Sequence, residues 1–214
     1  MFIGMTGVVA FERSGVRGFL HRPLDPDAAG LALTHGAGGN CSSPLIARTA
    51  TAFCAAGLWV LRFDLAFRRR RPRGPPSLSS AAADRALLRQ ALAELRAIAP
   101  GPLFLGGHSY GGRQASLLAA EDPEPAVALL LLSYPLHPPG WAESRRTEHF
   151  PRLRLPTVFV HGTRDPFGAV EELRAAVAMI AAPAQVVVVD GAGHDLRHGD
   201  FDSAPAVTAL TATR

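Results

Sequence analysis

Short apolar runs rich in β-branched residues alternate along the chain with longer amphipathic stretches. The runs that have the length of buried strands cover residues 31–34, 58–63, 103–105, 127–132, 157–161 and 186–190. The stretches expected to form helices cover residues 43–56, 79–99, 111–120, 170–181 and 204–212. Regular alternation of strands and helices is typical of βαβ units. The pattern therefore predicts an α/β fold with a mostly parallel central sheet and helices on both of its faces.

The N-terminal part of the chain has a different pattern. Residues 8–12 and 16–21 are two strand-like runs separated only by Arg13-Ser14-Gly15, which predicts an antiparallel hairpin at the edge of the sheet. Farther along, residues 66–76 (AFRRRRPRGPP) have the composition of a loop. No internal repeat or shift in composition marks a domain boundary, so we expect one domain that covers residues 1–214.

The composition is that of a globular protein. The chain has 214 residues, of which 48% are hydrophobic and 19% are charged, and a chain of this length can bury a core without disulfide or metal support. The longest apolar runs, at residues 126–132 and 184–189, are far shorter than the ~20 residues that a membrane span requires. The amino terminus lacks the basic start of a signal peptide. We therefore expect a cytoplasmic protein with no membrane span.

All 22 basic residues are arginine, and lysine is absent. This excludes Schiff-base catalysis, pyridoxal phosphate anchoring and the P-loop, because each of them needs a lysine amine. The formal net charge is +4, and the densest basic cluster runs from Arg68 to Arg71 and includes Arg73. A solvated loop explains this cluster better than a nucleic-acid site, so no nucleic-acid partner is expected. Cys41 and Cys54 have no zinc-finger spacing and are predicted to be reduced thiols.

A G-x-S-x-G motif lies between the predicted strand at residues 103–105 and the helix that follows it. Its residues are Gly107, His108, Ser109, Tyr110 and Gly111. The glycines allow a tight strand-to-helix turn, and such a turn exposes the serine hydroxyl above the edge of the sheet. The motif therefore predicts a nucleophile elbow, with Ser109 as the catalytic nucleophile.

A serine nucleophile needs an imidazole to accept its proton and usually an acid to orient that imidazole. Asp165 follows the strand at residues 157–161, and His194 follows the last predicted strand. The order Ser109, Asp165, His194 along the chain is that of α/β-hydrolases. Two alternatives stay open for the acid, because Asp165 could instead cap the helix after Pro166, and Asp64 also follows a strand.

Two backbone N–H groups should bind the negative charge that develops on the substrate oxygen. Tyr110 N–H supplies one of them from the elbow. The glycine-rich loop at His35, HGAGG, is expected to supply the other, from Ala37 or, as second choice, from Gly38.

Several histidines adjoin this predicted site. His35, His108 and His161 lie at strand ends, where imidazoles usually form hydrogen bonds with nearby backbone, so we expect them to support the site structurally. His194 and His198 in the sequence HDLRH could bind a metal if the segment were helical. The glycines around this segment indicate a loop, and no HExxH pattern occurs. We therefore expect no metal and no cofactor.

Several motifs together resemble one small branch of the α/β-hydrolase superfamily. This branch includes a domain of a testis-expressed protein, a domain in a subunit of the NSL histone acetyltransferase complex, and bacterial relatives. The matching segments are HGAGG at His35, RFDLAF at Arg62, GGHSYGGRQAS at Gly106, SYPLHPPG at Ser133, PTVFVHGTRDPFG at Pro156 and GHDL at Gly193. The chain is more distantly similar to dienelactone-hydrolase-like enzymes, which have cysteine where this chain has Ser109, so their substrate is not transferred.

The resemblance and the motifs together imply a serine hydrolase of the α/β-hydrolase fold that cleaves carboxylic esters through an acyl-enzyme. The non-catalytic alternative is a scaffold or binding module, because some relatives serve inside larger assemblies. Thioesterase, peptidase and acyltransferase activities stay open as well.

Residues 133–155 occupy the place where related lipases carry a lid, and they are too few for a cap domain. Such an open site favours small, short-chain esters. Tyr134, Leu136 and Trp141 are expected to line the substrate pocket. The arginine-rich segment from Arg68 to Arg73 should lie near the catalytic face, where it could steer anionic esters to the site.

Overall fold

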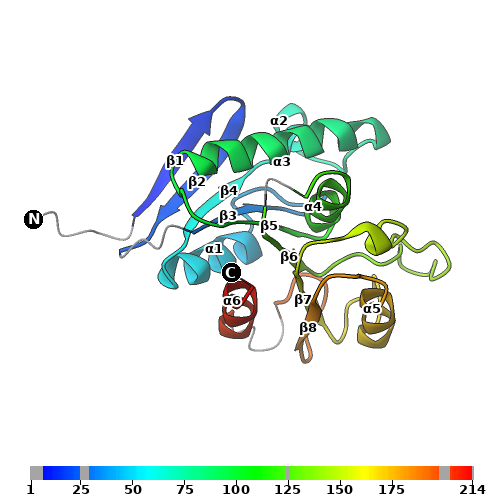
Figure 1. Ribbon diagram of the computed structural model, residues 1–214. Helices are drawn as coiled ribbons and strands as arrows, with labels where there is room; N and C mark the ends of the chain where they lie inside the picture. Colours follow the sequence, from blue (N-terminus) through cyan, green and yellow to red (C-terminus); the bar gives the residue numbers. More distant parts are fainter. Residues whose placement is uncertain (1–6, 25–28, 124–125, 198–202, 214) are drawn as a thin grey trace, which may run out of the picture.

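The computed structural model describes residues 7–24, 29–123, 126–197 and 203–213. Its centre is an eight-stranded sheet with the order β1-β2-β4-β3-β5-β6-β7-β8 (Figure 1). The strands are β1 (Gly7–Arg13), β2 (Val16–Arg22), β3 (Gly30–Thr34), β4 (Trp59–Phe63), β5 (Leu103–His108), β6 (Ala128–Leu132), β7 (Thr157–Gly162) and β8 (Ala184–Val189). The helices are α1 (Pro44–Ala55), α2 (Ala66–Arg70), α3 (Ala81–Arg96), α4 (Tyr110–Glu121), α5 (Val170–Val177) and α6 (Ala204–Thr211).

The N-terminal hairpin is antiparallel, as the sequence predicts. Strand β1 pairs with β2 along its whole length, and β2 pairs antiparallel with β4, whereas all other neighbours in the sheet are parallel. The two-residue turn between β1 and β2 consists of Ser14 and Gly15, which both have positive φ. Such turns match the twist of the two strands that they connect.

Helices cover both faces of the sheet, which confirms the expected layers (Figure 1). Successive side chains of a strand point to opposite faces, so Leu31 and Leu33 of β3 share a core with α1 and α6. Ala32, which lies between them, shares the opposite core with α3, α4 and α5. Strands β3 and β6 are buried at every position, as expected for strands covered on both sides.

The described residues form no cap domain over the sheet. Residues 133–156, between β6 and β7, are all described, and their only regular element is the 3-10 turn η2 (Phe150–Arg152). Another 3-10 turn, η1 (Leu78–Ser80), precedes α3. Within the described ranges, no helix is long and apolar enough to cross a membrane.

One sequence expectation about the fold is wrong. Residues 66–76 are predicted as a loop, but the first part of this segment forms α2. The helix buries Phe67 in the core and Arg68 below the surface, at 3% and 6% exposure. An arginine-rich composition is typical of solvated loops, and the burial of Arg68 depends on partners far away in the sequence, described below.

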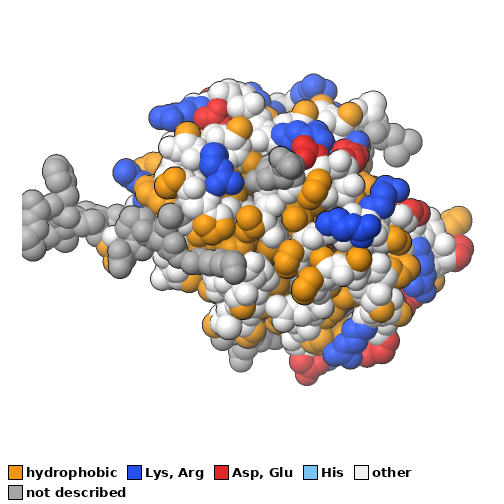
Figure 2. Space-filling view, viewed as in Figure 1, with side chains coloured by type: hydrophobic (Ala, Val, Ile, Leu, Met, Phe, Trp, Pro, Cys, Tyr) orange, Lys and Arg blue, Asp and Glu red, His pale blue; other side chains and the backbone are white. Residues whose placement is uncertain are grey.

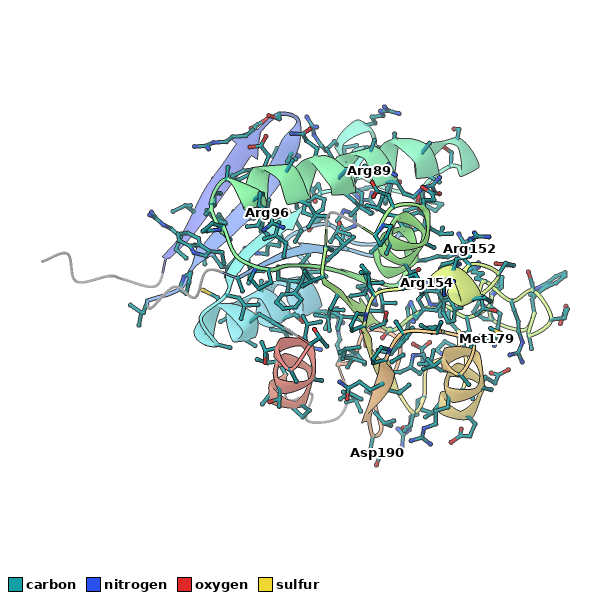
Figure 3. The ribbon with its side chains drawn as sticks, in the orientation of Figure 1. Arg89, Arg96, Arg152, Arg154, Met179 and Asp190 are labelled. Carbon is teal, nitrogen blue, oxygen red and sulfur yellow. The ribbon has the colours of Figure 1, made fainter. Side chains whose placement is uncertain are left out.

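Arginine side chains are dispersed over the face of the molecule shown in Figure 2, and several of them lie beside acidic side chains. Arg89 and Arg96 extend from α3, whereas Arg152 ends η2 and Arg154 follows it (Figure 3). Arg89 forms ion pairs with Glu121 and Asp122. On this face the positive charge is therefore divided among separate small groups.

Candidate active site

Ser109 occupies a tight turn between β5 and α4. Its backbone has φ 50° and ψ −116°, a positive φ that residues other than glycine rarely adopt. The turn brings two backbone segments together, because a Cβ atom on Gly107 would lie 2.6 Å from the carbonyl carbon of Gly111. This close approach explains the glycine at position 107. The geometry is that of a strand–turn–helix elbow with the serine at its tip.

The structure brings Ser109, His194 and Asp165 together from three different loops at one edge of the sheet. His194 Nε2 lies 2.8 Å from Ser109 Oγ. His194 Nδ1 lies 2.8 Å from Asp165 Oδ2 and 3.0 Å from Oδ1. A carboxylate can only accept a hydrogen bond, so Nδ1 carries the proton and Nε2 is free to accept the hydroxyl proton of Ser109. The arrangement can therefore activate the serine as a nucleophile.

The alternatives for the acid have other contacts. Helix α5 begins at Val170 with Ala169 before it, so Asp165 does not cap this helix. Instead, Asp165 Oδ1 accepts a hydrogen bond of 2.9 Å from Phe167 N–H. Asp64 Oδ1 accepts a hydrogen bond of 2.7 Å from Cys41 N–H, and its Oδ2 lies 3.7 Å from Arg17 Nη2 of the hairpin strand β2.

Two neighbouring rings, those of Phe167 and His108, lie beside the His194 imidazole. The Phe167 ring lies 4.2 Å from it at an interplanar angle of 33°. His108 Nε2 donates a 2.8 Å hydrogen bond to the backbone carbonyl of His194. Burial and the nearby His194 lower the pKa of His108 to about 4, so His108 remains neutral at physiological pH. These contacts fix both the ring and the backbone of His194.

His161 and His35 also bind backbone near the site. His161 Nε2 donates to the carbonyl of Gly168 at 2.8 Å, in the loop that carries Asp165. His35 Nε2 accepts a hydrogen bond of 3.1 Å from Leu65 N–H. His35 Nδ1 therefore carries the proton and donates to the Gly36 carbonyl at 2.8 Å. Burial lowers the pKa of His35, and the neutral ring supports the glycine-rich loop.

The residues expected to supply the oxyanion donors lie around the serine. Ala37 and Gly38 line a cavity with Ser109. Tyr110 is the first residue of α4, and the first N–H groups of a helix have no partner inside the helix. The loop passes close to the elbow, since a Cβ atom on Gly36 would lie 2.8 Å from His108 Nδ1. Glycine at position 36 is thus needed for this approach.

The cavity beside Ser109 has a volume of about 380 Å³. Its walls are formed by Gly36, Ala37, Gly38, Gly39, Ser43, Pro44, Leu45, Ile46, His108, Ser109, Phe167, His194, Asp195 and Arg197. Leu45, Ile46 and Phe167 provide the large apolar surfaces. Arg197 forms a 2.9 Å ion pair with Asp195 and is largely exposed. The cavity is thus an apolar groove beside the serine with a polar rim.

Tyr134, Leu136 and Trp141, which the sequence predicts to line the substrate pocket, are not among the residues that line this cavity. Ser133 has a φ of 47°, and the chain after it turns into the core. Tyr134 is fully buried, and its hydroxyl donates to the carbonyl of Arg146 at 2.7 Å.

Leu136 is also buried, at 1% exposure, whereas Trp141 is 62% exposed. The cavity wall comes from the start of α1 and from Phe167. The sequence reasoning missed Phe167, although an aromatic residue two positions after the acid was a usable signal.

A second serine–histidine pair lies inside the molecule. Ser116 Oγ and His149 Nε2 are 2.8 Å apart, and both residues are buried, at 0% and 1% exposure. The Ser116 hydroxyl donates to the carbonyl of Arg113 at 2.9 Å. With the hydroxyl proton on that carbonyl, His149 Nε2 donates its own proton to the Ser116 oxygen. In this arrangement the histidine does not act as the base of the serine.

The metal alternative involves His198, which lies outside the described residues. Among the residues that the structure describes, no group of three or more His, Cys, Asp or Glu side chains is placed to hold a metal ion. Cys41 and Cys54 are both buried and free. Burial, together with the nearby Asp64, raises the pKa of the Cys41 thiol to about 11.

Comparison with known proteins places the chain among hydrolases. The family model for an alpha/beta hydrolase domain matches residues 27–206. Among solved structures, TT1662 from Thermus thermophilus is similar with a TM-score of 0.78 and 21% identity, covering 98% of both chains.

Two further structures are similar over nearly their whole length. Dienelactone hydrolase from Anabaena variabilis has a TM-score of 0.71 and 21% identity, covering 99% of this chain and 96% of that one. XC6422 from Xanthomonas campestris, described as an α/β serine hydrolase without a lid, has a TM-score of 0.69 and 16% identity. The match covers 100% of this chain and 95% of XC6422. At these identities the similarity shows a shared fold.

Proposed function

This chain belongs to the alpha/beta-hydrolase domain family, and we propose that it is a serine hydrolase that cleaves carboxylic esters through an acyl-enzyme on Ser109. The observation that carries the proposal is the unbroken chain of hydrogen bonds from Ser109 Oγ through His194 to Asp165. Each contact in this chain is 2.8 Å long. Its proton arrangement is the one that nucleophilic catalysis requires.

In the proposed reaction, His194 Nε2 takes the proton of Ser109 as Oγ attacks the ester carbonyl carbon. The carbonyl π bond opens, and the negative charge on its oxygen is bound by the N–H of Tyr110 and the N–H of Ala37 or Gly38. The C–O bond to the alcohol then breaks as His194 gives its proton to the leaving oxygen.

Water then repeats the sequence on the acyl-enzyme and releases the carboxylic acid. Asp165 holds the His194 tautomer through both halves of the reaction.

The cavity supports small esters as substrates. Its volume of about 380 Å³ and its apolar walls at Leu45, Ile46 and Phe167 suit a short acyl or alcohol group. In the part of the chain that the structure describes, no cap domain stands between these walls and solvent. The apolar side chains of the segment between β6 and β7 that are buried pack into the core, namely Tyr134, Leu136, Phe150 and Leu153. We therefore propose short-chain carboxylic esters, with p-nitrophenyl acetate as the model substrate.

The test is covalent labelling with a fluorophosphonate probe, followed by hydrolysis of p-nitrophenyl esters of increasing acyl length. We expect labelling of the native protein, no labelling of Ser109→Ala, and kcat/KM values that decline as the acyl chain outgrows the cavity. Folded native protein that neither reacts with the probe nor hydrolyses any ester would support a non-catalytic binding module instead. In that case the proposal would be rejected.

A further inference from the structure

We propose that Arg68 is a positioning residue for the oxyanion hole: from α2 it holds the loop at residues 36–39 so that Gly38 N–H faces the substrate oxygen. The inference rests on the proposed function and deepens it. It also assigns a role to the part of the arginine cluster that is buried. Arg68 does not line the cavity, so it would act through the loop backbone without touching the substrate.

The Arg68 guanidinium donates four hydrogen bonds to backbone carbonyls. Nε reaches Gly39 O at 2.7 Å and Nη2 reaches Ala37 O at 2.7 Å. Two further bonds of 3.1 Å go to the carbonyls of Arg71 and Gly74. The shortest contacts are thus the two to the glycine-rich loop. A planar guanidinium suits this task because it presents several donors in one rigid fork.

Peptide geometry connects these contacts to the active site. In a trans peptide, the C=O of one residue and the N–H of the next point in opposite directions. When Arg68 binds the Ala37 carbonyl, it therefore fixes the direction of Gly38 N–H on the opposite side of that peptide. Gly38 lines the cavity beside Ser109. Arg68 thus controls the orientation of one of the two candidate donors from this loop.

The neighbouring peptide is held by a different side chain. The Gly36 carbonyl accepts hydrogen bonds from His35 Nδ1 at 2.8 Å and from Gly39 N–H at 3.1 Å. By the same geometry, these bonds fix the direction of Ala37 N–H. The loop therefore presents two N–H groups that are set independently, one by His35 and one by Arg68. Loss of Arg68 should release the Gly38 donor and leave the Ala37 donor in place.

Helix α2 is itself fastened to the elbow. Asp84 of α3 is fully buried, and its Oδ1 accepts the N–H of Phe67 at 2.9 Å. Its Oδ2 accepts the hydroxyl of Tyr110 at 2.7 Å, next to the serine. The Phe67 ring makes edge contacts with both Tyr110 and His35, at centroid distances of 5.6 and 5.7 Å. One short helix thereby links the loop donors to the elbow donor.

Arg70 offers a matched control. It lies on the same helix and carries the same charge, but its side chain is exposed. Arg68→Met and Arg70→Met therefore remove the same group from one helix, with only the first removing the loop contacts. For both variants we would measure kcat and KM with p-nitrophenyl acetate and the inhibition constant of an aryl trifluoromethyl ketone, which forms a tetrahedral adduct with the serine.

We expect Arg68→Met to lower kcat by about 10- to 100-fold, since complete loss of one oxyanion donor lowers kcat by ~10²- to 10³-fold. KM should change by less than about threefold, because the donor matters most once negative charge develops. The inhibition constant of the ketone should rise by the same factor as kcat falls. The midpoint of the pH–rate profile should not move, because Arg68 does not contact His194. Arg70→Met should match the native protein in all four quantities.

If Arg68→Met does not fold, Arg68→Lys takes its place. We expect this variant to lower kcat by about 3- to 10-fold, because one ammonium group can bind only some of the four carbonyls that Arg68 binds. Native kcat and native ketone affinity in a folded Arg68 variant would overturn the inference and leave the proposed function intact. The same conclusion would follow if the loss appeared in KM alone. Absence of probe labelling in the native protein would instead overturn the proposed function, and the inference with it.

Discussion

The two serine–histidine pairs of this molecule have the same hydrogen-bond length and opposite proton arrangements. In the pair of Ser109 and His194, Asp165 takes the Nδ1 proton, and the imidazole can accept from the serine. In the pair of Ser116 and His149, the serine gives its proton to a backbone carbonyl, and the imidazole donates. The distance between serine and histidine therefore does not identify a nucleophile. The hydrogen-bond partners on either side of the pair identify it.

Access separates the two pairs as well. Ser109 lies in a strained turn at the edge of a cavity, whereas Ser116 lies on α4 under the segment that precedes η2. His149 Nδ1 has no hydrogen-bond partner among the described residues, and its environment is otherwise aromatic and cationic, with Phe150, Arg113 and Arg152 nearby. We call Ser116 and His149 the inner pair, and Ser109 and His194 the outer pair. We interpret the inner pair as a structural contact between α4 and the chain before β7.

The largest expected difference is between Ser109→Ala and Ser116→Ala. Ser109→Ala should lower kcat by about 10⁴- to 10⁶-fold, because no nucleophile remains. Ser116→Ala should change kcat by less than about twofold and should lower the free energy of unfolding by about 1–3 kcal/mol, since it leaves a buried imidazole N–H without its acceptor. Ester hydrolysis and urea unfolding of both variants measure these effects. Loss of activity in folded Ser116→Ala would remove the distinction between the pairs.

Replacing Asp165 tests the proton arrangement directly. Asn at this position can donate from its amide to His194 Nδ1, which would place the ring proton on Nε2 and make the outer pair resemble the inner one. We expect Asp165→Asn to lower kcat by about 10³- to 10⁴-fold with a nearly unchanged structure. Activity within tenfold of the native value would show that the tautomer of His194 is not set by Asp165.

The same comparison shows what sequence can predict. Ser109, His194 and Asp165 could be singled out because their side chains carry the chemistry and each follows a strand. The strands and the helical layers were predictable because they depend on local hydrophobic period. The burial of Tyr134 and Leu136 was not predictable, because it depends on the backbone turn at Ser133. Helix α2 was missed because the carbonyls that Arg68 binds lie about thirty positions earlier in the chain.

The inner histidine should also affect stability in acid. Burial and the charges of Arg113 and Arg152 lower the pKa of His149 to about 4. Between pH ~6.5 and 4 the unfolded chain therefore binds a proton that the folded protein does not. This contribution to stability is complete above pH ~6.5 and is lost as pH falls toward 4.

In urea unfolding, we expect His149 to lower the free energy of unfolding by about 1 kcal/mol for each pH unit as pH falls through this range. His149→Gln keeps a donor for Ser116 and cannot titrate, so the free energy of unfolding of this variant should depend less steeply on pH by that amount. The pKa of His21 is likewise lowered to about 4, mainly by burial, and its slope should persist in the variant. An unchanged slope in His149→Gln would contradict the neutral state of the inner pair.

Phe167 is present only beside the outer pair, where its ring covers the His194 imidazole. Phe167→Leu keeps an apolar wall and removes the ring contact, which is worth about 0.5–1.5 kcal/mol for aromatic pairs. We expect kcat to fall about 3- to 10-fold, because His194 becomes less firmly oriented. Leu45→Ala, which changes another apolar residue of the cavity wall, serves as the control and should change KM more than kcat. A Phe167→Leu variant altered only in KM would limit Phe167 to a role in substrate binding.

The smallest expected effect concerns the exposed part of the arginine cluster. Arg69, Arg70, Arg71 and Arg73 are exposed and do not line the cavity, so any attraction of anionic esters acts through solvent and is screened by salt. Only the outer pair can benefit, because the inner pair is closed to substrate. We expect kcat/KM for a carboxylate-bearing ester to fall about two- to threefold between 0.02 and 0.3 M salt, and kcat/KM for its neutral analogue to stay constant. Equal salt dependence of both esters would show that the exposed arginines do not steer substrate, and the role of the cluster would then reside in the buried Arg68 alone.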